Sequence, residues 1–229
     1  MIKGVIFDFN GTLFWDSHLH YDAWIDFSKK LRGKSFSDYE MKKYMFGRTN
    51  ADIIEYAVGK KLPAEEIEQL AKEKESYYRD MCRRSPELFH LAPGAVEFLN
   101  FLKENNIPRT IATMSEKDNV DFYIEGFNLS QWFDLDKIVY SDGTIPGKPN
   151  PDIFLIAADK LNLHPQDCVV FEDALSGIEA AYRAGIGKII AVTSMEDKTY
   201  YEGIKGVDYI IPNFVNIDNL LFPNVTIEA

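Results

Sequence analysis

The fold of this chain is decided by the stretch Val5-Ile6-Phe7-Asp8-Phe9-Asn10-Gly11-Thr12-Leu13. An apolar run reaches a carboxylate at Asp8 and breaks at Gly11. Such a run is typical of a buried strand in a parallel sheet, which is apolar on both faces. A carboxylate at the C-terminal end of that strand lies where open α/β sheets bind ligands, so Asp8 is a candidate nucleophile or metal ligand. The alternative is that Asp8 only caps a turn, and this stretch by itself favours neither interpretation.

The composition limits the class of protein and of partner. The chain has 229 residues, of which 46% are hydrophobic and 27% are charged, as in ordinary globular proteins. A net charge of -11 argues against a nucleic-acid partner, although a metal ion and a few local cations can still create a site for a small anion. No apolar run is long enough to span a membrane, and the N-terminus has no signal-peptide pattern. Cys82 and Cys168 lack metal-binding spacing and suggest a reducing compartment, so we expect a cytoplasmic protein.

Hydrophobic periodicity separates a helical segment from a segment of alternating strands and helices. Residues 16–88 have only helical patterns, including a capping-box signal at Ser37 and Glu40. After them, strands predicted near 107–114, 137–140, 168–171, 188–192 and 209–211 alternate with helices. This alternation predicts an α/β fold with a Rossmann-like parallel sheet and helices on both faces. We therefore expect a core domain of residues 1–15 and 89–229, with a small all-α domain of residues 16–88 inserted after strand 1.

Polar residues lie at or beyond the ends of four predicted strands and could converge at one edge of the sheet. The carboxylates of Asp8 and Asp173 offer the hard oxygen ligands that Mg²⁺ prefers. Lys148 and the hydroxyl of Thr113 can bind phosphate oxygens and neutralise developing charge. The other Asp8 oxygen can attack phosphorus and form an aspartyl phosphate. The chemistry typical of this set is phosphoryl transfer. The four groups are Asp8 with Asn10, Thr113 with Ser115, the Gly147-Lys148-Pro149 turn, and Glu172 with Asp173.

These residues make the sequence resemble the haloacid dehalogenase superfamily of phosphatases and phosphomutases, and within it the β-phosphoglucomutase-like branch. Asp8-Phe9-Asn10-Gly11-Thr12 is similar to the first family motif, Thr113 to the second, Lys148 to the third and Glu172-Asp173 to the fourth. The motifs occur in the family order, and the resemblance covers the whole chain. It implies Asp8 as the nucleophile and Mg²⁺ as the cofactor. The implied metal ligands are Asp8, the backbone carbonyl of Asn10, Glu172 and Asp173, and the implied substrate contacts in the core domain are Thr113, Met114, Ser115 and Lys148.

The helical insertion resembles the small mobile cap of that branch, and three of its residues are candidate substrate contacts. His20 begins a segment similar to a His-x-x-Ala-Trp motif of the branch, whose histidine lies in the hinge region. Arg48 follows Gly47 where the branch has a substrate-specificity loop, and an arginine after a turn can present a guanidinium fork to phosphate. Lys74 aligns with a cap lysine that meets substrate. The alternatives are that His20 is an ordinary surface residue and that Lys74 belongs to a solvated charge run.

Asn10 departs from the family pattern, which usually has an acid/base aspartate at this catalytic position. An amide cannot donate or accept a proton in that way at neutral pH, although the backbone carbonyl could still contact the metal. General acid–base help is typically worth about 10²–10⁴-fold, so activity could be low rather than absent. The residue could belong to a slow natural enzyme or one that uses good leaving groups, to an engineered variant, or to a vestigial site. Asn10-Gly11 is also a deamidation-prone pair, and deamidation would generate the missing aspartate.

The function that these features favour is a Mg²⁺-dependent phosphatase of a small phosphorylated metabolite, with a sugar phosphate as the expected substrate. One alternative is a phosphomutase of the β-phosphoglucomutase type, which the cap resemblance favours and Asn10 weakens. Another is a non-catalytic module that binds a phosphorylated ligand, although such a module would not need Asp8 as a nucleophile. We expect no nucleic-acid or membrane partner, and a monomer, which is common for this architecture.

Overall fold

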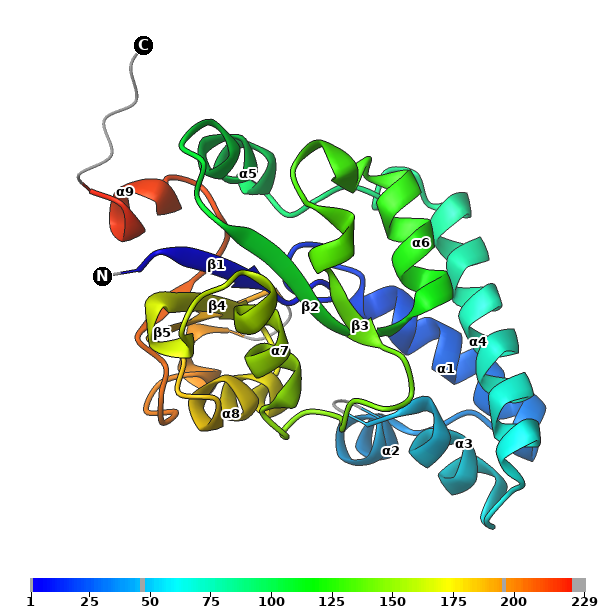
Figure 1. Ribbon diagram of the computed structural model, residues 1–229. Coiled ribbons are helices and arrows are strands. Elements are labelled where there is room, and N and C mark those ends of the chain that lie inside the picture. Colours follow the sequence, from blue (N-terminus) through cyan, green and yellow to red (C-terminus); the bar gives the residue numbers. More distant parts are fainter. Residues whose placement is uncertain (1, 46–47, 195–196, 224–229) are drawn as a thin grey trace. The chain divides into compact units, whose positions relative to one another are not determined.

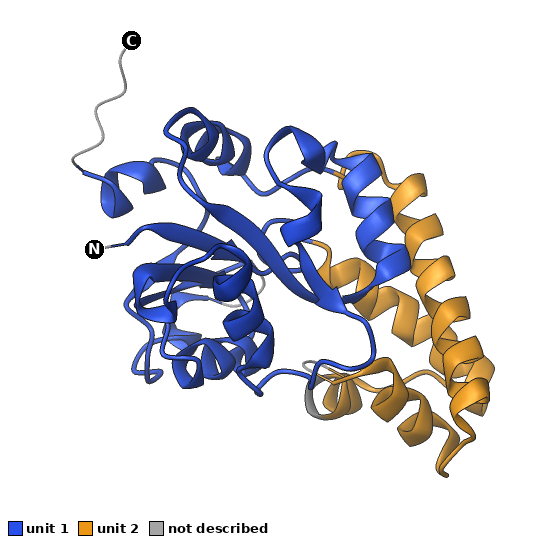
Figure 2. Ribbon diagram, in the orientation of Figure 1, with its two compact units in different colours: residues 1–15, 90–229 blue, residues 16–89 orange. Residues whose placement is uncertain are grey.

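The chain forms two compact units in the computed structural model, which describes residues 2–45, 48–194 and 197–223. Unit 1 contains residues 1–15 and 90–229, and unit 2 contains residues 16–89 (Figure 2). The first boundary follows Trp15, and the second follows Phe89, one residue beyond the expected position. Unit 2 is therefore an uninterrupted insertion into unit 1, and each unit is described by itself.

Unit 1 is built on a six-stranded sheet whose paired strands are all parallel (Figure 1). The strand order is β3-β2-β1-β4-β5-β6, so β1 lies in the middle of the sheet between β2 and β4. In the register, Phe7 of β1 pairs with Ile111 of β2 and with Phe171 of β4. The predicted α/β fold class is confirmed. The strands are β1 (Gly4–Phe7), β2 (Arg109–Glu116), β3 (Val139–Ser141), β4 (Cys168–Glu172), β5 (Lys188–Val192) and β6 (Tyr209–Ile211).

Helices cover both faces of this sheet, which explains why β1 and β4 are apolar at successive positions. Ile6 and Val170 belong to a core cluster with the helices α7 (Asp152–Lys160) and α8 (Leu175–Arg183). Successive side chains of a strand point to opposite faces of the sheet, so Phe7 and Phe171 point to the face opposite α7 and α8. There the two rings stack 5.2 Å apart and pack against Phe98 of α5 (Ala95–Glu104). The remaining helices of this unit are α6 (Lys117–Gly126) and α9 (Ile217–Leu221), with short 3-10 helices at Leu129–Gln131, Leu135–Lys137, Pro165–Asp167 and Lys198–Tyr200.

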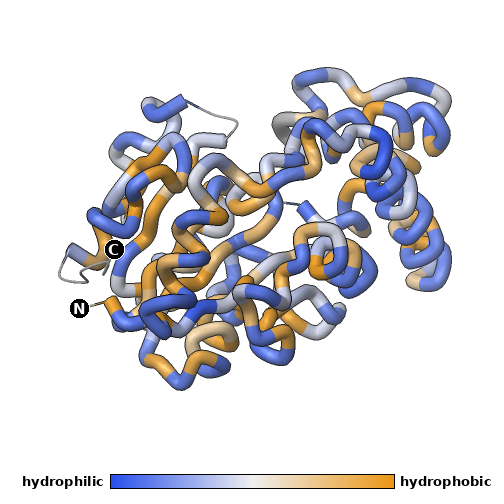
Figure 3. The backbone as a smooth tube through the Cα atoms, turned by 90° about the horizontal axis from the view of Figure 1, so that it is seen from above, coloured by the Kyte–Doolittle hydropathy of each residue, from blue (hydrophilic) through white to orange (hydrophobic). Residues whose placement is uncertain are grey.

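The described residues of unit 2, 16–45 and 48–89, form four helices and a core of their own. The helices are α1 (Ser17–Arg32), α2 (Asp38–Tyr44), α3 (Asn50–Val58) and α4 (Ala64–Arg84). Trp24 and Phe27 of α1 share a buried cluster with Ile54 of α3 and Ala71 of α4. Blue and orange alternate along the helices in Figure 3, as amphipathic sequences require. The capping box at Ser37 and Glu40 is present, since each side chain accepts a hydrogen bond from the other residue's backbone N–H.

No helix within residues 2–45, 48–194 and 197–223 combines the length and the apolar character needed to cross a membrane.

Candidate active site

Asp8 lies directly after β1 and faces a lysine that comes from a distant loop. Its backbone N–H donates to the carbonyl of Phe171 at 3.0 Å, which extends the pairing of β1 with β4 by one residue. Lys148 donates from Nζ to Asp8 Oδ1 at 2.6 Å and to Glu172 Oε1 at 2.6 Å. The three side chains are almost completely buried. A turn cap needs no lysine 140 residues away, so the geometry favours the site interpretation of Asp8.

Lys148 is held as a cation between these two carboxylates. Burial by itself lowers the pKa of a lysine because it disfavours the charged form. Here the opposite charges of Asp8 and Glu172, together with their hydrogen bonds, outweigh burial and raise the pKa of Lys148 above its ordinary value. The ammonium group is therefore charged at neutral pH and lies beside Asp8, where a cation can neutralise a bound anion.

Three carboxylates at the ends of β1 and β4 could hold a cation. Asp8, Glu172 and Asp173 each offer an oxygen within 4.8 Å of the others. Carboxylate oxygens are the ligands that Mg²⁺ prefers, so the donor set fits this ion. A Cβ added to Gly11 would lie 2.1 Å from Asp173 Oδ2, which means that the Asp173 carboxylate packs directly against the glycine backbone. Thr12 also donates from Oγ1 to Asp173 Oδ1 at 3.3 Å.

Both carboxylate oxygens of Glu172 accept hydrogen bonds, and these give the residue a positioning role. One carboxylate oxygen accepts from Lys148, and the other accepts from the backbone N–H of Ala174 at 2.7 Å. Gly177 on α8 leaves the space for this arrangement, because a Cβ there would lie 1.7 Å from Glu172 Oε1. Glu172 thus orients the lysine of the site, in addition to being a candidate metal ligand.

The amide of Asn10 is engaged by three side chains of the second motif and α6. Its Oδ1 accepts from Ser115 Oγ at 2.6 Å and from Thr113 Oγ1 at 3.4 Å. Its Nδ2 donates to Tyr123 Oη at 2.8 Å. Tyr123 is buried, and its ring stacks on Phe9 with centroids 4.6 Å apart. Asn10 therefore joins the first and second motifs through its side chain.

This arrangement opposes deamidation of Asn10 in the folded protein. Deamidation requires the backbone nitrogen of Gly11 to attack the side-chain carbonyl carbon of Asn10, with loss of ammonia. The Gly11 N–H instead donates to the carbonyl of Phe14 at 2.7 Å, and the Asn10 amide is held by its hydrogen bonds. The fold therefore restrains both groups that would have to meet.

The three residues of the second motif, Thr113, Met114 and Ser115, have different surroundings. Thr113 is buried, and its Oγ1 also accepts from the Ser115 backbone N–H at 3.1 Å. Ser115 is partly exposed, whereas the Met114 side chain packs against the core cluster of α7 and α8. The structure thus brings Thr113 and Ser115 to Asn10, while the predicted substrate contact of Met114 stays a prediction.

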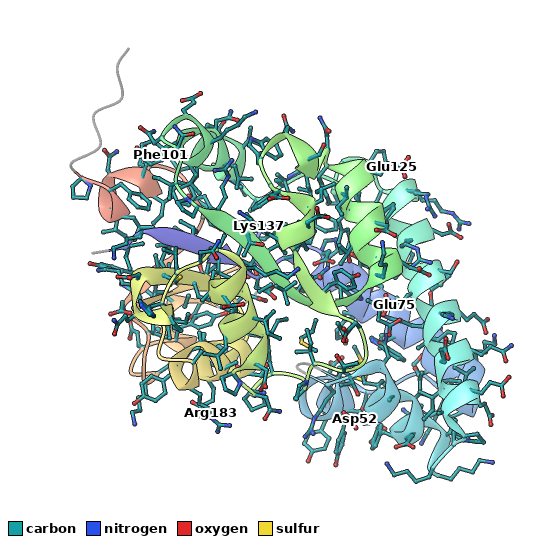
Figure 4. The ribbon with its side chains drawn as sticks, viewed as in Figure 1. Asp52, Glu75, Phe101, Glu125, Lys137 and Arg183 are labelled. Carbon is teal, nitrogen blue, oxygen red and sulfur yellow. The ribbon has the colours of Figure 1, made fainter. Side chains whose placement is uncertain are left out.

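The cap candidates lie in unit 2, where His20 and Lys74 contact each other. Lys74 is 1% exposed and donates from Nζ to His20 Nδ1 at 2.9 Å and to Glu75 Oε1 at 2.9 Å. The other ring nitrogen of His20, Nε2, lies 3.4 Å from Asp16 Oδ2. Figure 4 labels Glu75 on α4. Lys74 thus lies inside the helical unit and not on a solvated charged face.

Arg48 is exposed and lies just before α3. Its backbone N–H donates to the Met45 carbonyl at 3.1 Å. Gly47, which precedes it in the predicted specificity loop, lies outside the described residues. The substrate contacts predicted for His20, Arg48 and Lys74 stay predictions.

Three residues next to the site are not among the site residues predicted from the sequence. Tyr123 has the spacing of a core residue on a helix, and Gly177 that of an ordinary small helix residue. Tyr201 belongs to a loop without a motif, yet its hydroxyl reaches the fourth motif. Tyr123 and Tyr201 are identified only by contacts with distant segments, and Gly177 by its contact with Glu172, five residues earlier.

The chain is similar to known proteins over most of its length. Residues 2–185 match the family model of the haloacid dehalogenase-like hydrolases. A phosphorylated carbohydrates phosphatase of Thermotoga maritima is 30% identical over 194 residues, which cover 83% of this chain and 85% of that protein. The β-phosphoglucomutase of Bacillus subtilis is 30% identical over 191 residues, 81% of either chain.

The comparison extends to solved structures. The crystal structure of a HAD hydrolase, family IA, variant 3, from Entamoeba histolytica is 40% identical, with a TM-score of 0.87. The match covers 99% of this chain and 96% of that one.

Proposed function

Because this chain belongs to the haloacid dehalogenase-like hydrolase family, we propose that it is a Mg²⁺-dependent phosphatase of a small phosphorylated metabolite, with sugar phosphates as the first class to test. The observation that carries the proposal is the buried Lys148 between Asp8 and Glu172. In this arrangement, Asp8 is available as the nucleophile, Lys148 is a fixed cation beside it, and Glu172 and Asp173 are candidate ligands for a metal ion. The similarity to a phosphorylated carbohydrates phosphatase supports the substrate class.

The reaction begins with attack by an Asp8 oxygen on the phosphorus of the substrate. A bond from Asp8 to phosphorus forms, the bond to the leaving oxygen breaks, and the phosphoryl group is transferred to Asp8. Lys148 and Thr113 are placed to neutralise the phosphoryl oxygens. When bound by Asp8, Asp173 and the Asn10 carbonyl, with Glu172 as a further candidate ligand, Mg²⁺ would add positive charge at the same oxygens. A water molecule then attacks phosphorus, which releases phosphate and restores Asp8.

Asn10 determines which substrates this mechanism suits. The leaving oxygen must depart without a proton from residue 10, and water must attack without a base there. The first step therefore favours substrates whose leaving group is stable as an anion, such as acyl or aryl phosphates. With poor leaving groups, the missing acid/base help predicts turnover about 10²–10⁴-fold below that of a complete site.

Phosphate release with Mg²⁺ tests the proposal on the unaltered protein and on the variants Asn10→Asp and Asp8→Asn. We expect Asn10→Asp to raise turnover of sugar phosphates, because a carboxyl group can donate and accept the proton that the amide cannot. The hydroxyls of Tyr123, Ser115 and Thr113 lie within hydrogen-bond distance of this side chain and can hold it in place. The gain should be smaller with an aryl phosphate, whose leaving group needs less protonation. Asp8→Asn should abolish release. Turnover that survives in Asp8→Asn would exclude Asp8 as the nucleophile.

A phosphomutase is the second candidate, favoured by the equal identity to a β-phosphoglucomutase. A mutase would return the phosphoryl group from Asp8 to a sugar hydroxyl instead of water. Isomerisation of β-glucose 1-phosphate without release of phosphate would establish this function. Binding of a phosphorylated ligand with neither reaction, in the natural sequence and in Asn10→Asp, would instead identify a non-catalytic module.

The proposal includes two expectations about the protein as a whole. We propose that it is cytoplasmic and monomeric. Cell fractionation tests the first expectation, and the mass measured by light scattering tests the second.

A further inference from the structure

The loop after β5 places a buried tyrosine against the turn that carries the fourth motif. Tyr201 follows the short 3-10 helix Lys198–Tyr200 and is 1% exposed. Its ring belongs to the core cluster beneath α7 and α8. Its hydroxyl donates to the backbone carbonyl of Asp173 at 2.6 Å. The residue is 28 positions beyond Asp173 in the sequence and lies outside the four motifs.

The Asp173 carbonyl lies at a point where the regular backbone pairing of the sheet has ended. β4 ends at Glu172 and α8 begins at Leu175, so Asp173 and Ala174 form the connection between them. The Ala174 N–H donates to the side chain of Glu172. Tyr201 supplies the partner for the preceding carbonyl. Two side-chain hydrogen bonds, one from each side, thus define the orientation of this short connection.

The orientation of the connection determines where the Asp173 carboxylate lies. That carboxylate packs against the backbone of Gly11 and accepts from Thr12, close to the carboxylates of Asp8 and Glu172. A rotation of the peptide between Asp173 and Ala174 would move the side chain relative to these neighbours. Because ligand residues that are held by hydrogen bonds bind metals more tightly, the partner of the carbonyl affects the cation site.

We propose that Tyr201 is a positioning residue for Mg²⁺, which acts through its hydrogen bond to the Asp173 carbonyl. The inference deepens the proposed function, since it concerns the cofactor of that same site. The hydroxyl does not contact the cation. It holds the turn in the conformation in which Asp173 faces Asp8, and the buried ring holds the hydroxyl.

The test compares Tyr201→Phe with Tyr200→Phe in the full chain. Tyr201→Phe retains the buried ring and removes only the hydroxyl. Tyr200→Phe removes a hydroxyl from the adjacent residue, which is 45% exposed. The measurements are the dissociation constant of Mg²⁺ by calorimetry without substrate, and the rise in melting temperature that Mg²⁺ causes. We expect Tyr201→Phe to weaken Mg²⁺ binding about tenfold, in the range found for outer-sphere partners of metal ligands, and Tyr200→Phe to change it less than twofold.

A combined variant separates positioning from general stability. In Asp173→Asn, Mg²⁺ binding is already weakened at the ligand itself, so adding Tyr201→Phe should weaken it little further. Unchanged Mg²⁺ affinity in a folded Tyr201→Phe protein would overturn the proposal, even if its melting temperature falls. Equal weakening by both tyrosine variants would also overturn it. If the natural sequence binds Mg²⁺ but releases no phosphate, the proposed phosphatase activity fails while calorimetry still decides the role of Tyr201.

Discussion

Single residues in this site are defined by close contacts that their chemical type does not reveal. Glu172 is acidic and next to Asp173, and the family pattern treats the pair as metal ligands. In the structure, both of its oxygens accept hydrogen bonds, one from Lys148 and one from Ala174. Gly177 allows this because a Cβ at that position would occupy the space of the Glu172 carboxylate. The position of Lys148 beside Asp8 thus depends on a glycine outside the acidic pair.

Gly177→Ala should reduce phosphatase turnover about tenfold or more, because the added methyl group would displace Glu172 and with it Lys148. Helix propensity acts in the opposite direction, since alanine favours a helix over glycine by about 1 kcal/mol. Steady-state kinetics at saturating Mg²⁺ measure the effect, and circular dichroism checks that the variant is folded. Ser176→Ala, on the same turn of α8, is the control. Equal turnover in the two alanine variants would contradict the role assigned to Gly177.

Asn10 should remain an amide in the folded protein and deamidate when the chain is unfolded. The fold restrains the Gly11 nitrogen and the Asn10 side chain, and unfolding releases both. Peptide mass spectrometry would follow residue 10 during parallel incubations in buffer and in concentrated urea at the same pH. Conversion at equal rates in both samples would show that the observed hydrogen bonds give no protection.

Among the elements, α1 and α2 show how polar contacts stabilise a helical unit. Arg32 at the end of α1 donates from Nη1 and Nη2 to the two oxygens of Glu40 in α2, at 2.6 and 2.9 Å. The same carboxylate accepts from the Ser37 backbone N–H and from Tyr56 Oη. The arginine hydrogen bonds, followed by that of Ser37, hold the pKa of Glu40 well below its ordinary value. The capping box and the ion pair therefore share one acidic residue.

The sign of this pKa shift predicts how stability depends on pH. A carboxylate with a lowered pKa in the folded state contributes stability that is complete above its ordinary pKa of 4.5 and is lost as pH falls below that value. Arg32→Gln removes the largest cause of the shift. The free energy of unfolding of this variant, measured by urea titration between pH 7 and pH 3, should therefore decrease less on acidification than that of the natural sequence.

The exposed pair of Lys72 and Glu68 offers a matched control for this experiment. Its side chains are 60% and 65% exposed, whereas those of Arg32 and Glu40 are 13% and 18% exposed. Exposed ion pairs contribute little because water and salt screen them. Lys72→Gln should leave the pH dependence close to that of the natural sequence. A response to Lys72→Gln as large as that to Arg32→Gln would argue against a special role for Glu40.

At the scale of the whole molecule, residues 16–89 are inserted into unit 1. The candidate site residues of unit 1 come from the chain before and after this insertion. Asp8 and Asn10 precede residues 16–89, whereas Thr113, Lys148 and Asp173 follow them. Unit 2 has its own buried cluster around Trp24 and its own polar interior around Lys74. The insertion therefore contains the contacts that a separately folding unit needs.

Residues 16–89, expressed alone, should form a helical protein that unfolds cooperatively, as followed by circular dichroism and Trp24 fluorescence. In this fragment Lys74→Met should lower the free energy of unfolding by about 3 kcal/mol, because it leaves the buried Glu75 carboxylate without its charge partner. Lys72→Met, at an exposed position of the same helix, should have little effect. A fragment that stays folded and is unaffected by Lys74→Met would refute this structural role of Lys74.

The sequence by itself determined the parts of this protein that depend on local pattern. Apolar runs located the strands, helical periodicity located the insertion, and the residue types of Asp8, Thr113, Lys148 and Asp173 at the strand ends indicated phosphoryl transfer. These features were predictable because each motif lies in the C-terminal part of a strand or beyond it, and parallel strands bring their C-terminal ends to one edge. The first boundary could be placed because the pattern changes directly after β1.

Only the tertiary structure decided how the residues of the site support one another. The contact of Glu172 with Lys148, the position of the Asn10 amide between Ser115 and Tyr123, and the bond from Tyr201 to Asp173 join segments that are far apart in the chain. Such contacts depend on register and side-chain packing, which periodicity does not encode. A tyrosine or glycine in a helix or loop has many ordinary uses, and it acquires a specific one only through what the fold places beside it.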